Sequence, residues 1–366
     1  MDQAYEGGNE DMKPTIYIYN TLISALAKSG DKLEQAEELL RIMKRKAKRG
    51  QVDLTPTVVT YSSVMNVLAN SPARKAPVRA EKLLEQMHSE YLQTRNASIK
   101  PDTVAYSSAL QCWANSRAHN AAVRAQRLLS EMETRFIAGD KSVRPNEQCY
   151  GAVIHCWAKN ASPDAAVRAE KILAKMEQMH EKGINNVSPN TICCNALLDC
   201  YAKSVYEDKA QRALGLIRRM NEQYLMGNKS VKSDIISYNC LLNSCANTIT
   251  EDETIKRETI KIAVNALQQL VRSKDYFPTS YSFASFLKAC STLMPLGNER
   301  VELVKTAFRV CCDEGQVDRQ VLLELELALP EQLYIPLLRG YVVDGKAQME
   351  AIPDGWKRNV DKRRKL

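Results

Sequence analysis

The chain has 366 residues, 45% of them hydrophobic and 26% charged, with a net charge of +8; this composition can bury a core and excludes a disordered chain. The modest positive charge permits an acidic partner such as nucleic acid but does not require one. No apolar run is long enough to cross a membrane, and the eleven cysteines form no CxxC pair and no Cys/His spacing suited to zinc. We therefore expect no membrane association, no metal and no cofactor.

The chain begins with an acidic segment, residues 1–13, that contains no arginine. We expect this segment to be disordered. Its composition is neither that of a secretory signal nor that of an amphipathic transit peptide.

From residue 14 onward, one helical unit recurs. The steps between its anchor residues are 42–45 residues long. The anchors are Tyr19, Tyr61, Tyr106, Tyr150, Cys194, Tyr238 and Phe283. A period in this range indicates a solenoid of stacked units rather than one globular core.

Each unit opens with an amphipathic helix, which the second copy, PTVVTYSSVMNVLANS, illustrates. Pro56 restrains the entry and Thr57 can cap the helix. An apolar stripe then follows the i, i+3, i+4, i+7 pattern of one helix face. In this copy the stripe consists of Tyr61, Val64, Met65 and Leu68.

A second helix completes each unit with the signature Ala-x-x-(Leu/Ile)-(Leu/Ile)-x-x-Met, as in Ala80, Leu83, Leu84 and Met87. A single hairpin cannot bury both of its stripes, so the units must stack. Cysteines recur on the apolar face of the first helices, where we expect them to be buried as small hydrophobes. They are Cys112, Cys156, Cys200, Cys245 and Cys290.

The seventh copy is weaker than the others and ends near Asp318. Residues 319–350 are predicted to form one or two capping helices, interrupted at Pro330, because a terminal repeat must face water. Residues 351–366 form a basic tail that we expect to be loose.

The combined phrase Pro-(Asp/Asn)-x-x-x-Tyr-(Asn/Ser)-x-x-(Leu/Ile), followed by the Ala-x-x-Leu-Leu-x-x-Met signature, resembles the pentatricopeptide repeat family. The first unit, YIYNTLISALAKSGDKLEQAEELLRIM, is very similar to the family consensus, and the resemblance extends over residues 14–318. It implies an all-α fold, a right-handed α-solenoid superhelix of about seven helical hairpins. Repeats of the family are typically shorter than those in this chain, and the added residues lie between the helices and after the second one.

Proteins of this family bind single-stranded RNA with one base per repeat. The resemblance places base reading at the residue after each anchor, paired with the residue after the proline that opens the next unit. These pairs are Asn20 with Thr57, Ser62 with Asp102, Ser107 with Asn146, Gly151 with Asn190, Asn195 with Asp234, and Asn239 with Thr279. The family's preferences suggest the RNA 5′-(pyrimidine)-G-A-(purine)-U-(pyrimidine)-3′. A seventh pair, Ala284 with Asp318, is poor.

Two further sets of residues follow from the resemblance. The side chains expected to sandwich the bases are Tyr17, Val59, Val104, Ile192, Ile236 and Tyr281, and Gln148 departs from this pattern. The lysines expected near the RNA backbone are Lys28, Lys159 and Lys203. Phosphate contacts of this kind would make the affinity depend on salt.

The same residues also have a purely structural interpretation. The second members of the pairs are Ser, Thr, Asp or Asn-type residues at helix starts, where such side chains cap helices; capping and base reading are compatible. Arginines recur just before the alanine of the second helix, where a solvated or inter-repeat salt-bridge role is favoured over an RNA-binding stripe. They are Arg79, Arg124, Arg168 and Arg212.

No catalytic constellation is apparent, since the four histidines occupy unrelated repeat positions and no nucleophile-elbow, P-loop or deaminase signature occurs. We expect a sequence-specific binder of single-stranded RNA rather than an enzyme. The resemblance implies a role in RNA processing, stability or translation in mitochondria or plastids. Other RNA-processing proteins are possible partners, and a small-molecule substrate is not expected. The alternative is a protein–protein interaction scaffold of tetratricopeptide-like helical repeats.

Overall fold

The computed structural model describes residues 14–28, 32–160, 162–183, 187–338, 341–343, 346–347 and 349–360. The disorder expected for residues 1–13, and the end of the basic tail at 361–366, lie outside the described residues. The chain forms two compact units. Unit 1 comprises Met1–Asn160 with Lys171–Ser188, and unit 2 comprises Ala161–Glu170 with Pro189–Leu366.

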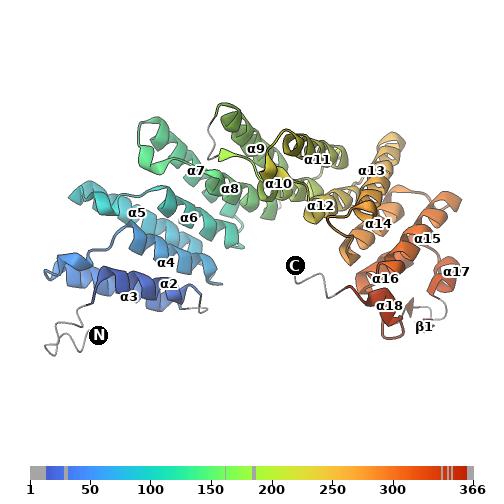
Figure 1. The fold of residues 1–366 in the computed structure, drawn as a ribbon, viewed down its shortest axis with the longest axis horizontal. Helices are drawn as coiled ribbons and strands as arrows, with labels where there is room; N and C mark the ends of the chain where they lie inside the picture. Colours follow the sequence, from blue (N-terminus) through green and yellow to red (C-terminus); the bar gives the residue numbers. More distant parts are fainter. Residues whose placement is uncertain are drawn as a thin grey trace. The chain divides into compact units, whose positions relative to one another are not determined.

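Unit 1 is a stack of helical hairpins, each with a first (A) and a second (B) helix (Figure 1). Its A helices are α2 (Ile16–Leu26), α4 (Val58–Asn70), α6 (Thr103–Asn115) and α8 (Glu147–Lys159). Its B helices are α3 (Leu33–Lys48), α5 (Ala76–Thr94) and α7 (Ala121–Ile137), while α9 (Ala165–Glu181) is divided between the units. Within this unit, α2, α4 and α6 each pack against the next A helix as well as against their own B helix.

Unit 2 repeats this arrangement. Its A helices are α10 (Thr191–Lys203), α12 (Ile235–Ala246), α14 (Ser280–Leu293) and α16 (Arg319–Ala328). Its B helices are α11 (Lys209–Leu225), α13 (Glu253–Arg272) and α15 (Asn298–Asp313). The consecutive A helices again pack against one another. The predicted all-α architecture of stacked hairpins is therefore confirmed in each unit.

The anchor residues and the stripes around them form the core. Tyr61, Tyr106 and Tyr150 are fully buried, and so are both late tryptophans, Trp113 and Trp157. The recurring cysteines are buried as expected, and burial raises the pKa of the Cys112 thiol to about 12. Their role as small apolar core residues is thus confirmed.

Each anchor tyrosine also carries a polar group that the apolar stripe did not predict. The hydroxyl of Tyr61 donates to Glu90 at 2.7 Å and that of Tyr106 donates to Glu131 at 2.8 Å. Both glutamates lie on the B helix of the same hairpin. A buried phenol needs such a partner. The bond links the two helices of one hairpin at Tyr61 and Tyr106, whereas Tyr150 donates at 2.9 Å to Glu133 of α7, in the preceding hairpin.

The residues added to each repeat lengthen the B helix and form a short 3₁₀ turn before the next A helix. These turns are η2 (Val52–Leu54), η3 (Ala97–Ile99), η4 (Lys141–Val143) and η6 (Lys229–Val231). Each turn buries its last residue, as Leu54 and Val143 show. Gly50, Gly139 and Gly227 end the preceding B helices with φ near +100°, a conformation that favours glycine. The turn therefore anchors the longer connection to the core.

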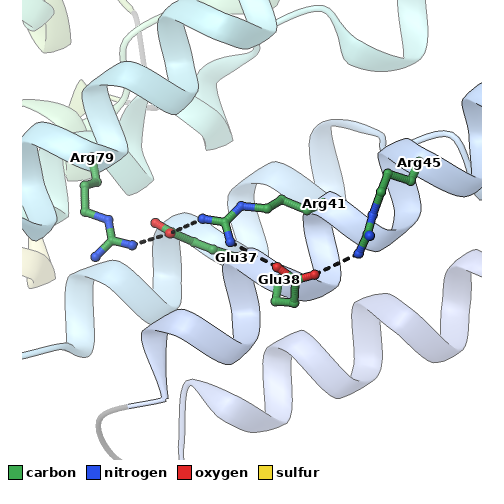
Figure 2. Close-up of polar contacts among 5 residues, drawn as sticks. All are labelled: Glu37, Glu38, Arg41, Arg45 and Arg79. Atoms are coloured by element: carbon green, nitrogen blue, oxygen red, sulfur yellow. Dashed lines mark hydrogen bonds and ion pairs between the residues drawn. The ribbon is translucent and has the colours of Figure 1, made fainter.

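Ion pairs join consecutive B helices. Figure 2 shows Glu37 of α3 between Arg41 of the same helix and Arg79 of α5. One repeat further on, Arg124 lies 2.8 Å from Glu81, whose side chain is 8% exposed. In unit 2, Arg212 lies 3.8 Å from Glu170. The prediction that these arginines form inter-repeat salt bridges is confirmed for Arg79, Arg124 and Arg212; Arg168 lies 3.8 Å from Asp164 of its own hairpin.

The C-terminal region is more ordered than the sequence suggested. After α16 come α17 (Glu331–Tyr334), η7 (Ile335–Leu338), a two-stranded antiparallel hairpin of β1 (Val342–Val343) and β2 (Lys346–Ala347), and α18 (Asp354–Lys357). The expectation of a loose segment from residue 351 onward is wrong for its first part. The Trp356 ring packs edge-on against Phe308 and Tyr341, and its carbonyl accepts from Val317 N–H at 2.8 Å. The half-buried Trp356 ring and this backbone hydrogen bond hold the segment against α15.

Candidate nucleic-acid interface

The N-terminal ends of the A helices carry the second members of the predicted base-reading pairs. All of these residues are helix N-caps: Thr57, Asp102, Asn146, Asn190, Asp234 and Thr279. Asp102 Oδ1 accepts from Ala105 N–H at 2.9 Å, and Asp234 Oδ1 accepts from Ser237 N–H at 2.9 Å. The capping interpretation is therefore confirmed. Both aspartates cap through Oδ1, and no protein donor contacts Oδ2 of either aspartate among the described residues.

Two substitutions of Asp102 test how its cap contributes to the stability of the protein. Asp102→Ala removes the acceptor and should lower the free energy of unfolding by about 1 kcal/mol. Asp102→Asn keeps an N-cap acceptor and should change the free energy of unfolding by only about 0.3 kcal/mol. Urea denaturation followed by circular dichroism measures both. Equal losses for the two variants would show that the charge, and not the hydrogen bond, stabilises α6.

The first members of the pairs lie on the A helices, one residue after each anchor. Asn20, Ser107, Asn195 and Asn239 are half-buried there, as is the backbone at Gly151. In unit 2 the predicted partners touch directly, because Asn195 Nδ2 donates to Asp234 Oδ1 at 3.0 Å. The structure thus brings together two residues that the sequence separates by one repeat.

Ser62 and Ser107 differ from the expectation of a solvent-facing polar group. Ser62 is 9% exposed, and its Oγ has no hydrogen-bond partner among the described residues. The Oγ of Ser107 donates to its own helix, at the carbonyl of Val104, over 3.0 Å. A serine side chain is shorter than that of asparagine. The hydroxyls of Ser62 and Ser107 therefore make no hydrogen bond with the next A helix among the described residues, whereas the longer Asn195 and Asn239 do.

A row of exposed apolar side chains lies beside the caps, two residues into the A helices. Its members are between 50% and 76% exposed: Tyr17, Val59 and Val104 in unit 1, and Ile192, Ile236 and Tyr281 in unit 2. These are the residues predicted to sandwich bases. Their exposure shows that these side chains contribute little to the core, and their role in sandwiching bases stays a prediction.

The predicted phosphate-contacting lysines are placed near the C-terminal ends of the A helices. Lys28 is exposed. Lys159 donates to the carbonyl of Ala114, at the end of the preceding A helix, over 2.6 Å, and Lys203 lies 2.5 Å from Asp199. An ammonium group beside a helix C-terminus is stabilised by the helix dipole. The phosphate role of these lysines stays a prediction.

Asparagines take the place of lysine in other repeats and make the same contact. Asn115 Nδ2 donates to the Ala69 carbonyl at 2.9 Å, and Asn247 Nδ2 donates to the Ala202 carbonyl at 3.2 Å. This position therefore supplies a donor that links successive A helices. Sequence reasoning missed that role, although the alternation of Lys and Asn, both of which carry donors, is a signal for it.

The described residues contain neither a cluster suited to a metal ion nor a helix suited to cross a membrane. No cluster of three or more His, Cys, Asp or Glu side chains that could hold a metal ion occurs in this part of the chain. None of the helices within the same residues combines the length and the apolar character needed to cross a bilayer.

Comparison with known proteins identifies the repeat. The model of the PPR repeat family matches residues 14–70, which contain the first hairpin and α4. No curated protein matches the sequence. The structure is similar to that of the pentatricopeptide repeat protein PPR10 from maize, at 17% identity and a TM-score of 0.48, over 96% of this chain and 45% of that chain. It is also similar to PPR10 in complex with an 18-nt psaJ RNA element, at 17% identity and a TM-score of 0.44, over 92% of this chain and 47% of that one.

The chain thus spans less than half the length of these solved relatives. The hairpin that the family model matches recurs in the same chain with the same anchors, stripes and caps. Residues 14–70 thus match the PPR repeat family, and the hairpin they contain recurs along the chain in extended repeats of 42–45 residues.

Proposed function

We propose that the protein binds single-stranded RNA in a sequence-specific manner along the N-terminal ends of its A helices. The row of exposed apolar side chains carries this proposal, because each member lies two residues after a polar cap. A flat base can rest on an apolar side chain while its edge reaches polar groups, the combination that single-stranded nucleic acids require.

The polar groups beside the row support recognition of base edges. Asparagine offers a donor and an acceptor, aspartate only accepts, and serine and threonine do either. If each pair reads one base, the pairs taken in chain order correspond to the RNA 5′-(pyrimidine)-G-A-(purine)-U-(pyrimidine)-3′. Lys28, Lys159 and Lys203 are proposed to approach the phosphates, for which the two paired lysines would exchange their present partners for RNA.

The biological role proposed is occupancy rather than catalysis. A bound protein shields RNA from nucleases, keeps it unpaired, or presents it to other RNA-processing proteins. The family resemblance alone supports action in mitochondria or plastids, in RNA processing, stability or translation.

A titration with labelled RNA tests the proposal. We expect a single-stranded RNA that contains the core UGAAUC to bind with a dissociation constant at least about tenfold below that of the same bases in scrambled order. The affinity should fall as salt rises from about 50 to 200 mM, since each phosphate contact releases a counterion. Fluorescence anisotropy at the two salt concentrations measures both effects.

The matching controls are the same core held in a duplex and a single-stranded DNA of the same sequence. Duplex RNA should not compete, because its bases are not available for sandwiching. Failure of every RNA to bind at the low salt concentration would contradict RNA binding and favour the scaffold alternative.

A further inference from the structure

Two of the predicted base-reading asparagines have their side-chain amide held by a serine of the next A helix. Ser237 Oγ donates to Asn195 Oδ1 at 2.6 Å, and Ser282 Oγ donates to Asn239 Oδ1 at 2.6 Å. Such a distance is typical of O–H···O bonds, whereas N–H···O bonds are usually about 2.9 Å. The amide oxygen is therefore the atom that faces each serine.

The environment of Ser282 fixes the direction of this bond. Its Oγ accepts from the N–H of Thr279 at 3.0 Å, which closes the capping box of α14, and it lies 3.2 Å from Thr279 Oγ1. Because Ser282 is fully buried, water does not compete for its proton. Asn239 Oδ1 receives that proton, so Asn239 Nδ2 points away from the serine. No protein acceptor contacts this Nδ2 among the described residues.

The first repeat has the same Asn–Thr pair but lacks this restraint. Thr60 occupies the position equivalent to Ser282, and its Oγ1 accepts from the N–H of Thr57 at 3.2 Å, closing the same capping box. The Oδ1 of Asn20 is also buried, but it has no hydrogen-bond partner among the described residues, so no hydrogen bond holds this oxygen in its buried position. Two pairs that are identical in sequence thus differ in the freedom of the asparagine amide.

We propose that Ser282 is a positioning residue that makes the sixth repeat select cytosine over uracil, while the first repeat accepts both. This inference rests on the proposed function. Cytosine and uracil differ at ring N3, which accepts a hydrogen bond in cytosine and carries an N–H in uracil. With its oxygen held by Ser282, Asn239 presents only the Nδ2 donor, which satisfies cytosine and opposes uracil. The unrestrained amide of Asn20 can rotate to suit either base.

If only the two residues of each pair determined the base, the first and sixth repeats would share one preference, because both pairs are Asn with Thr. A difference between the two repeats would therefore point to the third residue, Ser282 or Thr60. The fifth repeat is a weaker test, since Asn195 Nδ2 is also held by Asp234 Oδ1 at 3.0 Å. There, removal of Ser237 would leave a second restraint in place.

Four labelled RNAs with C or U at the first and last positions of the core, all other bases kept, provide the test. For the unmodified protein we expect about tenfold tighter binding of C than U at the last position and less than about twofold discrimination at the first. Ser282→Ala should reduce the ratio at the last position to about twofold or less. Thr60→Ala removes the same capping bond and is the matched control: it should leave both ratios unchanged.

Asn239→Asp extends the test to a variant that keeps the bond to Ser282 and replaces the donor by an acceptor. Asn239→Asp should invert the preference at the last position from cytosine to uracil. This variant also tests the inference if Ser282→Ala does not fold. Binding of all four RNAs with a ratio unaffected by Ser282→Ala, or a persistent cytosine preference in Asn239→Asp, would overturn this inference alone. Absence of binding by all four RNAs would overturn the proposed function and this inference with it.

Discussion

Replacing Ile192 and Ile236 together by alanine is expected to weaken RNA binding roughly 30-fold without changing the stability of the protein. The two side chains are 75% and 54% exposed, so their truncation leaves no cavity, and substitutions at such positions usually change stability by less than about 0.5 kcal/mol. In the proposed complex each contacts a base. Loss of that contact costs about 1 kcal/mol per base, at the low end of the range for aromatic stacking because isoleucine is aliphatic.

A matched control lies in the same unit. Val205 and Ile249 are 73% and 81% exposed, but they lie in the loops between A and B helices, away from the caps. The Val205→Ala/Ile249→Ala variant removes a similar apolar area and should bind RNA like the unmodified protein. Fluorescence anisotropy compares the affinities, and thermal unfolding confirms equal stability. Equal loss of affinity in the two double variants would assign the effect to general surface hydrophobicity and contradict the proposed row.

Replacing Arg124 by methionine should lower the free energy of unfolding by about 2–3 kcal/mol. The Glu81 carboxylate, 8% exposed, receives two hydrogen bonds from this guanidinium, at 2.8 and 3.1 Å. Without the arginine the carboxylate remains buried and uncompensated, which costs about 3–5 kcal/mol in a fully buried pair. The expected loss is smaller here because Arg124 is one-third exposed.

The equivalent substitution two repeats further along the chain supplies the control. Arg212 occupies the same repeat position, but both of its partners are exposed: Glu170, at 3.8 Å, is 40% exposed, and Asp208, at 3.0 Å, is 52% exposed. Arg212→Met should therefore cost less than about 1 kcal/mol, the usual value for an exposed pair. In the Arg124→Met background, Glu81→Met should restore most of the lost stability, because the buried charge is gone. Urea denaturation gives all four values. Equal losses at Arg124 and Arg212 would mean that burial of the acid does not set the energy.

Local patterns were sufficient for much of the fold. The stripe of Tyr61, Val64, Met65 and Leu68 predicts an amphipathic helix, and the residues are buried in α4. Thr57 predicts the start of that helix, which begins at Val58. Both inferences depend on contacts within about one turn of helix, and such contacts are encoded by neighbouring residues.

The C-terminal segment shows where this reasoning failed. Trp356 lies in a stretch without helical periodicity, flanked by basic residues, and a loose tail was the natural prediction. Its ring packs against Phe308, almost 50 residues earlier in the chain. No local pattern indicates which distant surface offers an apolar site for a single aromatic ring.

The sequence by itself determined the repeat, the faces that are buried and the caps, because each depends on helical periodicity repeated along the chain. The position of the exposed apolar row came from the family resemblance. Only the tertiary structure decided how far the polar side chains of the candidate interface are free. Asn20 and Asn239 are the same residue at the same repeat position, yet only the second meets a hydroxyl of the next A helix. That contact joins residues 43 positions apart. Its geometry depends on how two helices pack and on the side chain at the third position of the second one, which the pattern of a single repeat does not contain.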